Sequence, residues 1–331
     1  MTTSNALSWI VALALFGCSS PEEGQTGGGA ASSVGGAGGD AAAGGATDGG
    51  ANAGGAGGEA TGTGGAGGVG GDLHSGVIFA CGWEDGDVGQ DAFATGQVCT
   101  EWGANIDSTH SRSGNAAVRF EIRVGDLCNN NSARAELQIT AGNPLIAGTT
   151  DFWYAFSTFF PADYASDEVP ELFTQVLAND WDDTGHTGLP MGLWITNDQV
   201  SLKREWWPDG ETQHLQSHDV EPLIKGEWVD WVFHVVPAVD ETGLIQIWSR
   251  TQYASPGALN EEGYEMKLEV LGPNWMQGFM QPYFKVGAYK WKWNPSEPGP
   301  FDPDVRVFWL DEFKIGDSTS SIEDFLIPNP E

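Results

Sequence analysis

The chain has 331 residues, of which 46 are Asp or Glu and 14 are Lys or Arg, so its formal net charge is −32. Such an acidic chain is not expected to bind nucleic acid, because phosphate backbones attract basic surfaces. A polyanionic sugar is compatible with this charge only if the few cations gather locally, since ordinary salt screens charges that are more than about 8–10 Å apart.

The N-terminus has the features of a bacterial export signal. Residues 6–17 form an apolar run that is too short to span a membrane, and it ends in Leu15-Phe16-Gly17-Cys18. This ending resembles a lipoprotein processing site, at which Cys18 is lipidated. We therefore expect residues 1–18 to be a lipoprotein-type signal peptide with its lipidation site; the alternative is a non-lipidated secretory signal. Either way we expect an exported protein. With Cys18 lipidated, it is anchored to the bacterial cell envelope or cell surface and contacts the membrane through the lipid only.

Two further regions follow the signal. Residues 19–72 are rich in Gly, Ala, Ser and Thr and contain no aromatic residue, which predicts a disordered tether. Residues 73–331 hold the aromatic residues and are long enough for one large domain. Cys81, Cys99 and Cys128 lie in this domain, and export permits a disulfide. The spacing does not decide the pairing; Cys81–Cys99 closes the shortest loop and is preferred.

Short runs of β-forming residues, separated by Gly, Pro, Asn and Asp, predict an all-β domain. We expect a double-sheet jelly roll, a sandwich of two antiparallel sheets. The predicted strands are Val77–Ala80, Ala117–Val124, Ala133–Ile139, Phe152–Phe159, Leu172–Ala178, Met191–Thr196, Val200–Trp206, Trp228–Val236, Leu244–Ser249, Pro282–Lys290 and Val305–Ile315.

The strand Tyr283-Phe284-Lys285-Val286-Gly287-Ala288-Tyr289 is the most informative segment. Side chains alternate along a strand, so Tyr283, Lys285, Gly287 and Tyr289 share one face, which Trp291 and Trp293 would continue. The intervening residues are apolar and predict the core face. Two phenols and an ammonium in a row, with a gap above the glycine, suit an anionic, ring-shaped substrate.

This segment resembles a family motif. The pattern Tyr-x-Lys-x-Gly-x-Tyr near the C-terminus is similar to that of jelly-roll polysaccharide lyases, which include alginate lyases, glucuronan lyases and heparin lyase I-like proteins. The resemblance extends over roughly residues 78–316. It implies a concanavalin-like jelly-roll sandwich that cleaves a uronic-acid polymer by β-elimination. It also implies that Tyr289 is the proton donor and, as in some members, the base as well.

Two other strands carry the same resemblance. Arg134 and Glu136 match an Arg-x-Glu strand, in which the carboxylate pre-organises the guanidinium for a substrate carboxylate. Gln175 stands where these enzymes carry Gln-(Ile/Val)-His, but Leu177 replaces the histidine and cannot accept a proton. The base must then be another residue: Tyr289 first, His110 second, with His186 as a further candidate.

The remaining expectations concern substrate and metal binding. The substrate-binding residues are expected to be Lys285, Tyr283, Glu136, Arg204 and Trp291, and Lys290 and Lys292 add to the positive charge near this strand. No cofactor is required. In some concanavalin-like sandwiches an aspartate on the closing strand and an acidic residue near the first strand bind calcium, which here would be Asp311 with Glu84 or Asp85.

The predicted function is therefore that of a polysaccharide lyase, a monomer that acts on an acidic polysaccharide. An alternative is a non-catalytic, lectin-like carbohydrate-binding sandwich, which Leu177 and the acidic charge favour. A glycoside hydrolase ranks third, because the strands show no motif for the pair of carboxylates that hydrolysis needs.

Overall fold

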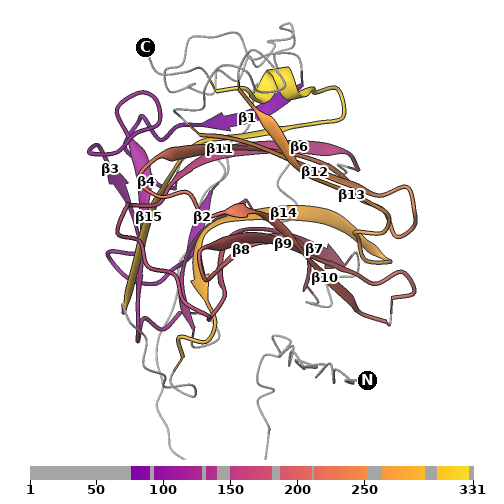
Figure 1. The fold of residues 1–331 in the computed structure, drawn as a ribbon, viewed down its shortest axis with the longest axis horizontal. Helices are drawn as coiled ribbons and strands as arrows, with labels where there is room; N and C mark the ends of the chain where they lie inside the picture. The colour runs from indigo at the N-terminus through magenta and orange to yellow at the C-terminus, as the bar shows by residue number, and fades with distance from the viewer. Residues whose placement is uncertain are drawn as a thin grey trace, which may run out of the picture. The chain divides into compact units, whose positions relative to one another are not determined.

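The computed structural model describes residues 76–89, 93–128, 132–139, 150–180, 187–210, 212–251, 263–294 and 304–327. These residues form fifteen β-strands and one short 3-10 helix, η2 (Ile322–Phe325). The strands form two antiparallel sheets that stack as a sandwich (Figure 1), which confirms the predicted fold class. The proposed signal peptide, Cys18 and the tether lie outside the described residues.

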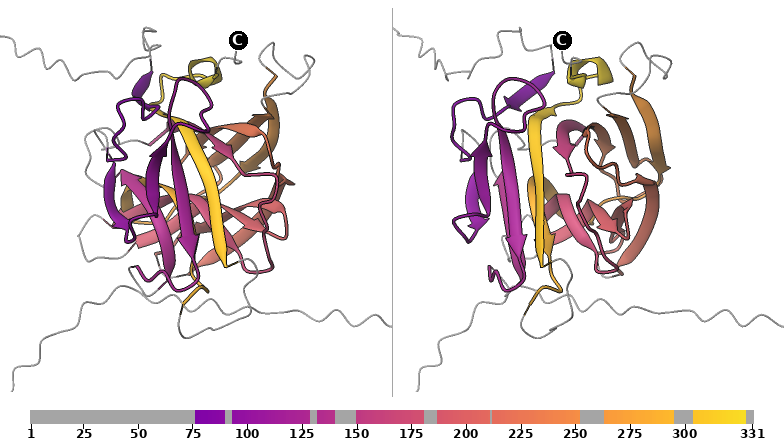
Figure 2. Two further views of the ribbon diagram at one scale, coloured as in Figure 1. Left: turned by 90° about the vertical axis from the view of Figure 1, so that its left-hand side faces the viewer. Right: turned by 60° about the vertical axis from the view of Figure 1, so that its left-hand side comes forward.

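The larger sheet has eight strands. Seven follow the order β13-β12-β11-β6-β15-β4-β3, and β1 also pairs with β15. Figure 2 shows the yellow β15 beside the purple β4, although the two strands are far apart in the chain. The strands are β1 (Val77–Cys81), β3 (Ala104–Asp107), β4 (Ala117–Arg123), β6 (Phe152–Phe159), β11 (Trp228–Val236), β12 (Leu244–Thr251), β13 (Glu265–Leu271) and β15 (Val305–Gly316).

The smaller sheet has seven strands in the order β10-β9-β8-β7-β14-β5-β2. It curves, with its concave face directed away from the larger sheet (Figure 1). Its strands are β2 (Ala94–Val98), β5 (Ala133–Ile139), β7 (Glu171–Asp180), β8 (Thr187–Thr196), β9 (Gln199–Trp206), β10 (His214–Pro222) and β14 (Phe279–Lys290).

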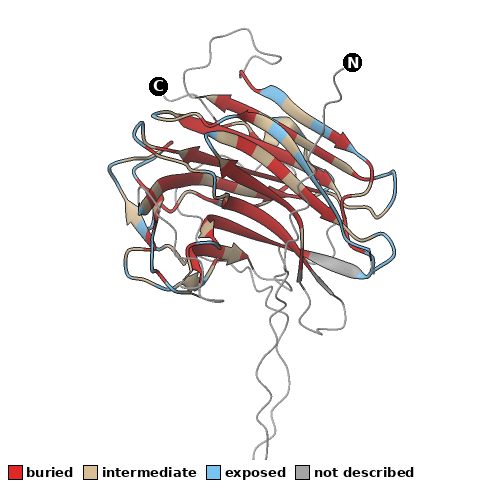
Figure 3. Cartoon of the chain, turned by 60° about the horizontal axis from the view of Figure 1, so that its bottom comes forward, coloured by how far each residue is buried: buried red, intermediate tan, exposed pale blue. Residues whose placement is uncertain are grey.

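Aromatic side chains fill the space between the sheets. Phe152 of β6 meets Phe284 of β14 edge to face at 5.4 Å, and Phe156 of β6 meets Phe173 of β7 at 6.5 Å. All four are essentially without solvent exposure. Figure 3 shows buried residues along the central strands, whereas exposed residues gather in loops and on an edge strand. This core fixes which face of each strand remains for a substrate.

All eleven predicted strands are present, and four further strands were not predicted. The missed strands are β2, β3, β10 and β13. Both β10 and β13 lie at the end of a sheet and are mostly exposed, so they lack the apolar alternation from which a strand is recognised.

The disulfide prediction was wrong. Cys99 is bonded to Cys128, at a sequence separation of 29 that includes β3 and β4, with 5.4 Å between their Cα atoms. Cys81 lies buried at the end of β1, within the core. The shortest loop closure was not selected because β1 belongs to the larger sheet and β2, which ends just before Cys99, to the smaller one. Among the described residues, no helix is long and apolar enough to cross a membrane.

Candidate active site

Strand β14 lies between β5 and β7 and brings the predicted residues of three strands together. Tyr289 is opposite Arg134 of β5, and Lys285 is opposite Gln175 of β7. Cross-strand partners project to the same side of a sheet. The alternate residues of β14 are part of the hydrophobic core, so this group occupies the concave face of the smaller sheet.

Arg134 stacks on the phenol ring of Tyr289. The guanidinium carbon lies 3.8 Å from the ring centroid, a cation–π contact. Nη1 of Arg134 also donates a hydrogen bond of 2.6 Å to Oε1 of Gln97 on β2. Arg134 is 7% exposed, while Tyr289 is partly exposed. The site thus holds a fixed cation directly against a tyrosine that solvent can reach.

Glu136 connects the other polar groups. It is 1% exposed and accepts a hydrogen bond from Nε2 of Gln175. Its Oε2 is 3.3 Å from Nε of Arg134 and 3.9 Å from Nζ of Lys285. A buried carboxylate needs such partners. Glu136 is too enclosed to meet a ligand itself, and it contacts both Arg134 and Lys285, so it holds these two cations in place.

Gly287 has a different role from the one expected. Its φ is +133°, and a Cβ there would lie 2.2 Å from the carbonyl oxygen of Ala135 and 2.9 Å from the ring of Phe120. The position of the missing side chain is therefore filled by β5 and the core. The glycine allows β5 and β14 to approach closely, and it leaves no gap for a sugar ring.

Aromatic side chains border the group. The ring of Trp291 is 6.5 Å from that of Tyr289 and meets Trp194 of β8 edge to face at 4.9 Å. Tyr283 is mostly buried, with Nζ of Lys285 at 5.9 Å from its ring. Trp293 was expected to continue this face and does not; it has no solvent exposure and packs in the core.

Leu177 lies on the same face as Gln175. It is opposite Tyr283, and the pairing of β7 with β14 has no irregularity between the two positions. The family's histidine would therefore lie on this face, but a leucine side chain cannot take up a proton. His186 falls outside the described residues.

Two predicted residues lie elsewhere. His110 packs against Trp309 of β15, with 4.2 Å between ring centroids, on the outer side of the larger sheet. Arg204 follows the core residue Leu202 by two positions, so it faces the space between the sheets and donates to the carbonyl oxygen of Pro273. Both assignments are corrected: neither residue can meet a substrate at Tyr289.

Lys290 also leaves the predicted cluster. It has no solvent exposure, and its Nζ lies 2.9 Å from Oδ1 of Asp167 and 3.7 Å from Oε2 of Glu171. As the neighbour of Tyr289, it points to the opposite face of β14. Its charge stabilises a buried ion-pair cluster and does not add to the concave face.

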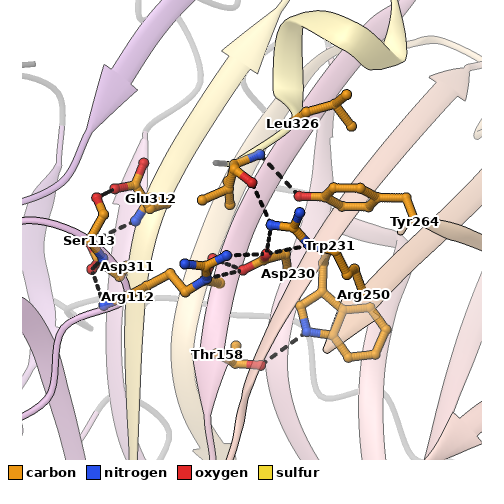
Figure 4. A network of polar contacts seen from close by, with 12 residues as sticks. Arg112, Ser113, Thr158, Asp230, Trp231, Arg250, Tyr264, Asp311, Glu312 and Leu326 are labelled. Carbon is orange, nitrogen blue, oxygen red and sulfur yellow. Dashed lines mark hydrogen bonds and ion pairs between the residues drawn. The ribbon is translucent and has the colours of Figure 1, made fainter. Parts of the chain in front are cut away.

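The predicted calcium ligands Asp311 and Glu84 accept hydrogen bonds from backbone N–H groups of one loop, residues 112–116. Asp311 accepts backbone hydrogen bonds from Arg112 (2.8 Å) and Ser113 (3.4 Å), and the Arg112 side chain binds Asp230 (Figure 4). Glu84 accepts backbone hydrogen bonds from the following residues of the same loop. Burial raises the pKa of Asp311 to about 8. No group of three or more His, Cys, Asp or Glu in the described part could hold a metal. Carboxylates engaged by N–H donors fit a structural clamp better than a calcium shell.

Two residues on the concave face were missed by the sequence reasoning. Trp194 of β8 and Lys203 of β9 each follow an inward-facing leucine, Leu193 and Leu202, by one position. Alternation alone therefore places them on the face of Tyr289.

Comparison with known proteins gives a family and a fold. Residues 82–314 match the family model described as "Polysaccharide lyase". The structure resembles an endo-β-1,4-glucuronan lyase from the fungus Trichoderma reesei, with a TM-score of 0.59 and 15% identity over 75% of this chain and 97% of that one. Two other structures are less similar. A PL-14 alginate lyase from Aplysia kurodai has a TM-score of 0.47 and 8% identity over 64% of this chain and 86% of that one. The catalytic domain of a glycoside hydrolase family 131 protein from Coprinopsis cinerea has a TM-score of 0.49 and 12% identity over 77% of this chain and 99% of that one. No curated protein sequence matches.

Proposed function

Because the chain belongs to the polysaccharide lyase family, we propose that it cleaves a uronic-acid-containing polymer by β-elimination on the concave face of the smaller sheet. The observation that carries this proposal is the stack of Arg134 on Tyr289 beside the group of Gln175, Lys285 and Glu136. It combines a residue able to exchange a proton with cations able to bind a carboxylate.

The reaction requires stabilisation of a carbanion next to a carboxylate. When the C5 proton of a uronate leaves, negative charge moves onto its carboxylate, and donors aimed at these oxygens lower the barrier. Arg134 and Lys285 supply the positive charge, and Gln175 has a second amide N–H besides the one donated to Glu136. Glu136 keeps these donors oriented.

Tyr289 then exchanges the protons. Its ionised oxygen takes the C5 proton, the C4–O4 bond breaks as the C4=C5 double bond forms, and the same tyrosine returns the proton to O4. One residue can serve both steps when both protons lie on the same side of the ring. This assignment needs no histidine at position 177.

The test is product analysis with the full chain. Polyuronates of different composition are incubated with the protein, and the ultraviolet absorbance of the unsaturated uronate is followed. We expect absorbance to rise with at least one polymer and not with the same polymer after reduction of its carboxyl groups. If no polyuronate yields the unsaturated product, the proposal fails.

Leu177 favours one other function, a lectin-like carbohydrate-binding surface. A domain that still binds the polysaccharide but no longer cleaves it would be expected to lack the family's histidine. The same experiment separates the two functions, because a binding domain would bind a polyuronate in titration calorimetry while leaving its absorbance unchanged.

We also propose that the protein acts at the bacterial cell surface, anchored through lipidated Cys18. The disulfide between Cys99 and Cys128 supports export, since such bonds persist in oxidising compartments. Incorporation of labelled fatty acid into the full chain, and its loss in Cys18→Ala, would test the anchor; equal labelling of both would refute it.

A further inference from the structure

Trp194 and Lys203 extend the concave face beyond the candidate active site. Nζ of Lys203 lies 4.3 Å from the ring centroid of Trp194. Lys203 is opposite Gly192 of β8, which is opposite Gln175 of β7. At about 4.8 Å between adjacent strands, Lys203 lies two strands, roughly 10 Å, from Gln175 in the same row.

Both residues present donors that have no acceptor among the described residues. Lys203 forms no ion pair or hydrogen bond there, and the buried Nε1 of Trp194 has no hydrogen-bond partner. Arg134 and Lys285, by contrast, share the carboxylate of Glu136. Burial lowers the pKa of the Lys203 ammonium below its usual value. Partly buried polar groups without acceptors are uncommon in folded proteins, and ligand sites are one setting in which they occur.

Aromatic rings connect this pair with Tyr289. Trp194 meets the edge of Trp291, and Trp291 is next to Tyr289. Across the strands, Tyr289 and Trp194 are both opposite Leu172. A saccharide chain lying across the strands would therefore pass from Tyr289 along this aromatic border to Lys203.

We propose that Lys203 and Trp194 form a second carboxylate-binding subsite, which holds a further uronate residue of the chain that is cleaved. The ammonium and the indole N–H bind the carboxylate, and the tryptophan ring packs against the sugar. This inference rests on the proposed function and deepens it: the substrate must carry acidic groups on further sugars of the chain, not on the reacting sugar alone.

Binding measurements test the subsite without depending on turnover. In a Tyr289→Phe background of the full chain, dissociation constants are measured for polyuronate fragments and for the same fragments with reduced carboxyl groups. We expect Lys203→Gln to weaken binding of the acidic fragments roughly tenfold, the usual consequence of losing a charged hydrogen bond. Lys203→Arg retains most of the affinity, and the reduced fragments bind all variants alike.

Two further variants exclude trivial explanations. Lys267→Gln removes the same charge from β13 of the other sheet and should leave binding unchanged. Trp194→Phe keeps a ring but removes the N–H, and should weaken only the acidic fragments. The inference is overturned if Lys203→Gln binds like Lys267→Gln, or if it loses affinity equally for acidic and reduced fragments, which indicates packing alone.

The outcomes also separate this inference from the proposed function. If the wild-type protein forms unsaturated product and Lys203→Gln binds acidic fragments normally, only the second subsite is refuted. If the wild-type protein neither binds nor cleaves any polyuronate, both proposals fail together.

Discussion

Glu136 shows how a single buried carboxylate organises the candidate site. Its oxygens face Arg134, Lys285 and the amide of Gln175, and it is 1% exposed. Removing it would leave two like charges close together in a poorly hydrated place. Its sequence signal was a modest Arg-x-Glu pattern, yet its position between three strands makes it the common partner of the proposed substrate-binding donors.

Replacement of Glu136 should therefore destabilise the fold. We expect Glu136→Ala to lower the free energy of unfolding by about 3 kcal/mol, because breaking a buried ion pair leaves the remaining charged groups buried without a counter-charge. Urea unfolding of the full chain measures this value.

Glu121 offers a matched control, because it also pairs with two arginines, Arg119 and Arg123, but these are 28% and 45% exposed. Glu121 itself is only 7% exposed, but its two arginines reach water and can be solvated when the carboxylate is removed, so Glu121→Ala should cost less than Glu136→Ala. Equal losses in the two variants would contradict the role given to Glu136.

Strands β5 and β14 depend on a residue without a side chain. At Gly287 a Cβ would collide with the backbone of β5, and the φ of +133° is unfavourable for other residues. The strand that carries Lys285 and Tyr289 thus keeps its register through close backbone contact.

Gly287→Ala should consequently lower the free energy of unfolding by at least about 2 kcal/mol, from the combined strain and overpacking. Gly210→Ala is the comparison: its φ is also positive, +76°, but a Cβ there meets nothing within 4 Å. We expect that variant to lose about 1 kcal/mol. Thermal or urea unfolding measures the stability of both variants. If Gly287→Ala is as stable as Gly210→Ala, this explanation is contradicted.

Asp311 on β15 should make the stability of the fold depend on pH. Burial, with a contribution from Glu312, raises the pKa of Asp311 to about 8, against 3.8 for the ordinary group. The folded state then binds more protons than the unfolded state between about pH 4 and pH 8, so this residue lowers stability as the pH rises through that window. Asp311→Asn should remove this part of the pH dependence, as measured by urea midpoints in the presence of a calcium chelator. Identical pH profiles for both proteins would refute the assignment.

The elements also show what the sequence could and could not predict. Alternation in the Tyr283–Tyr289 segment correctly predicted the row that β14 presents, because apolar residues define its inner face. The same rule, applied to β9, would have placed Lys203 on the concave face and Arg204 on the opposite one. His110 could not be placed this way, since it lies in a loop whose position depends on pairing between distant strands. The Cys99–Cys128 bond likewise follows from three-dimensional proximity and not from loop length.

At the scale of the whole molecule, the charge is distributed unevenly. The chain carries −32, yet Arg134, Lys285 and Lys203 gather among the described residues of the concave face, where Glu136 and, by the alternation of β9, Glu205 supply carboxylates. Other cations form ion pairs inside the structure: Lys290 pairs with Asp167, and Arg250 pairs with Asp230. The proposed polyanionic substrate would therefore be repelled at long range by the net charge and held at short range by these cations.

This distribution predicts an unusual salt dependence. Raising the ionic strength from about 0.01 M to 0.1 M shortens the screening length from about 30 Å to 10 Å, which suppresses the long-range repulsion first. We expect kcat/KM for a polyuronate to rise about two- to tenfold over this range. A steady fall from the lowest salt onward would mean that local attraction dominates at every distance.

The most direct test of the account is the activity of Tyr289→Phe on the polyuronate that the wild-type protein cleaves. Loss of a residue that both removes and returns a proton should lower kcat by roughly 10²–10⁴-fold, while the dissociation constant for the polymer stays within about threefold. That result would identify Tyr289 as the group that exchanges the protons. A variant that retains kcat within tenfold of the wild type would contradict this account and place the catalytic base elsewhere in the chain.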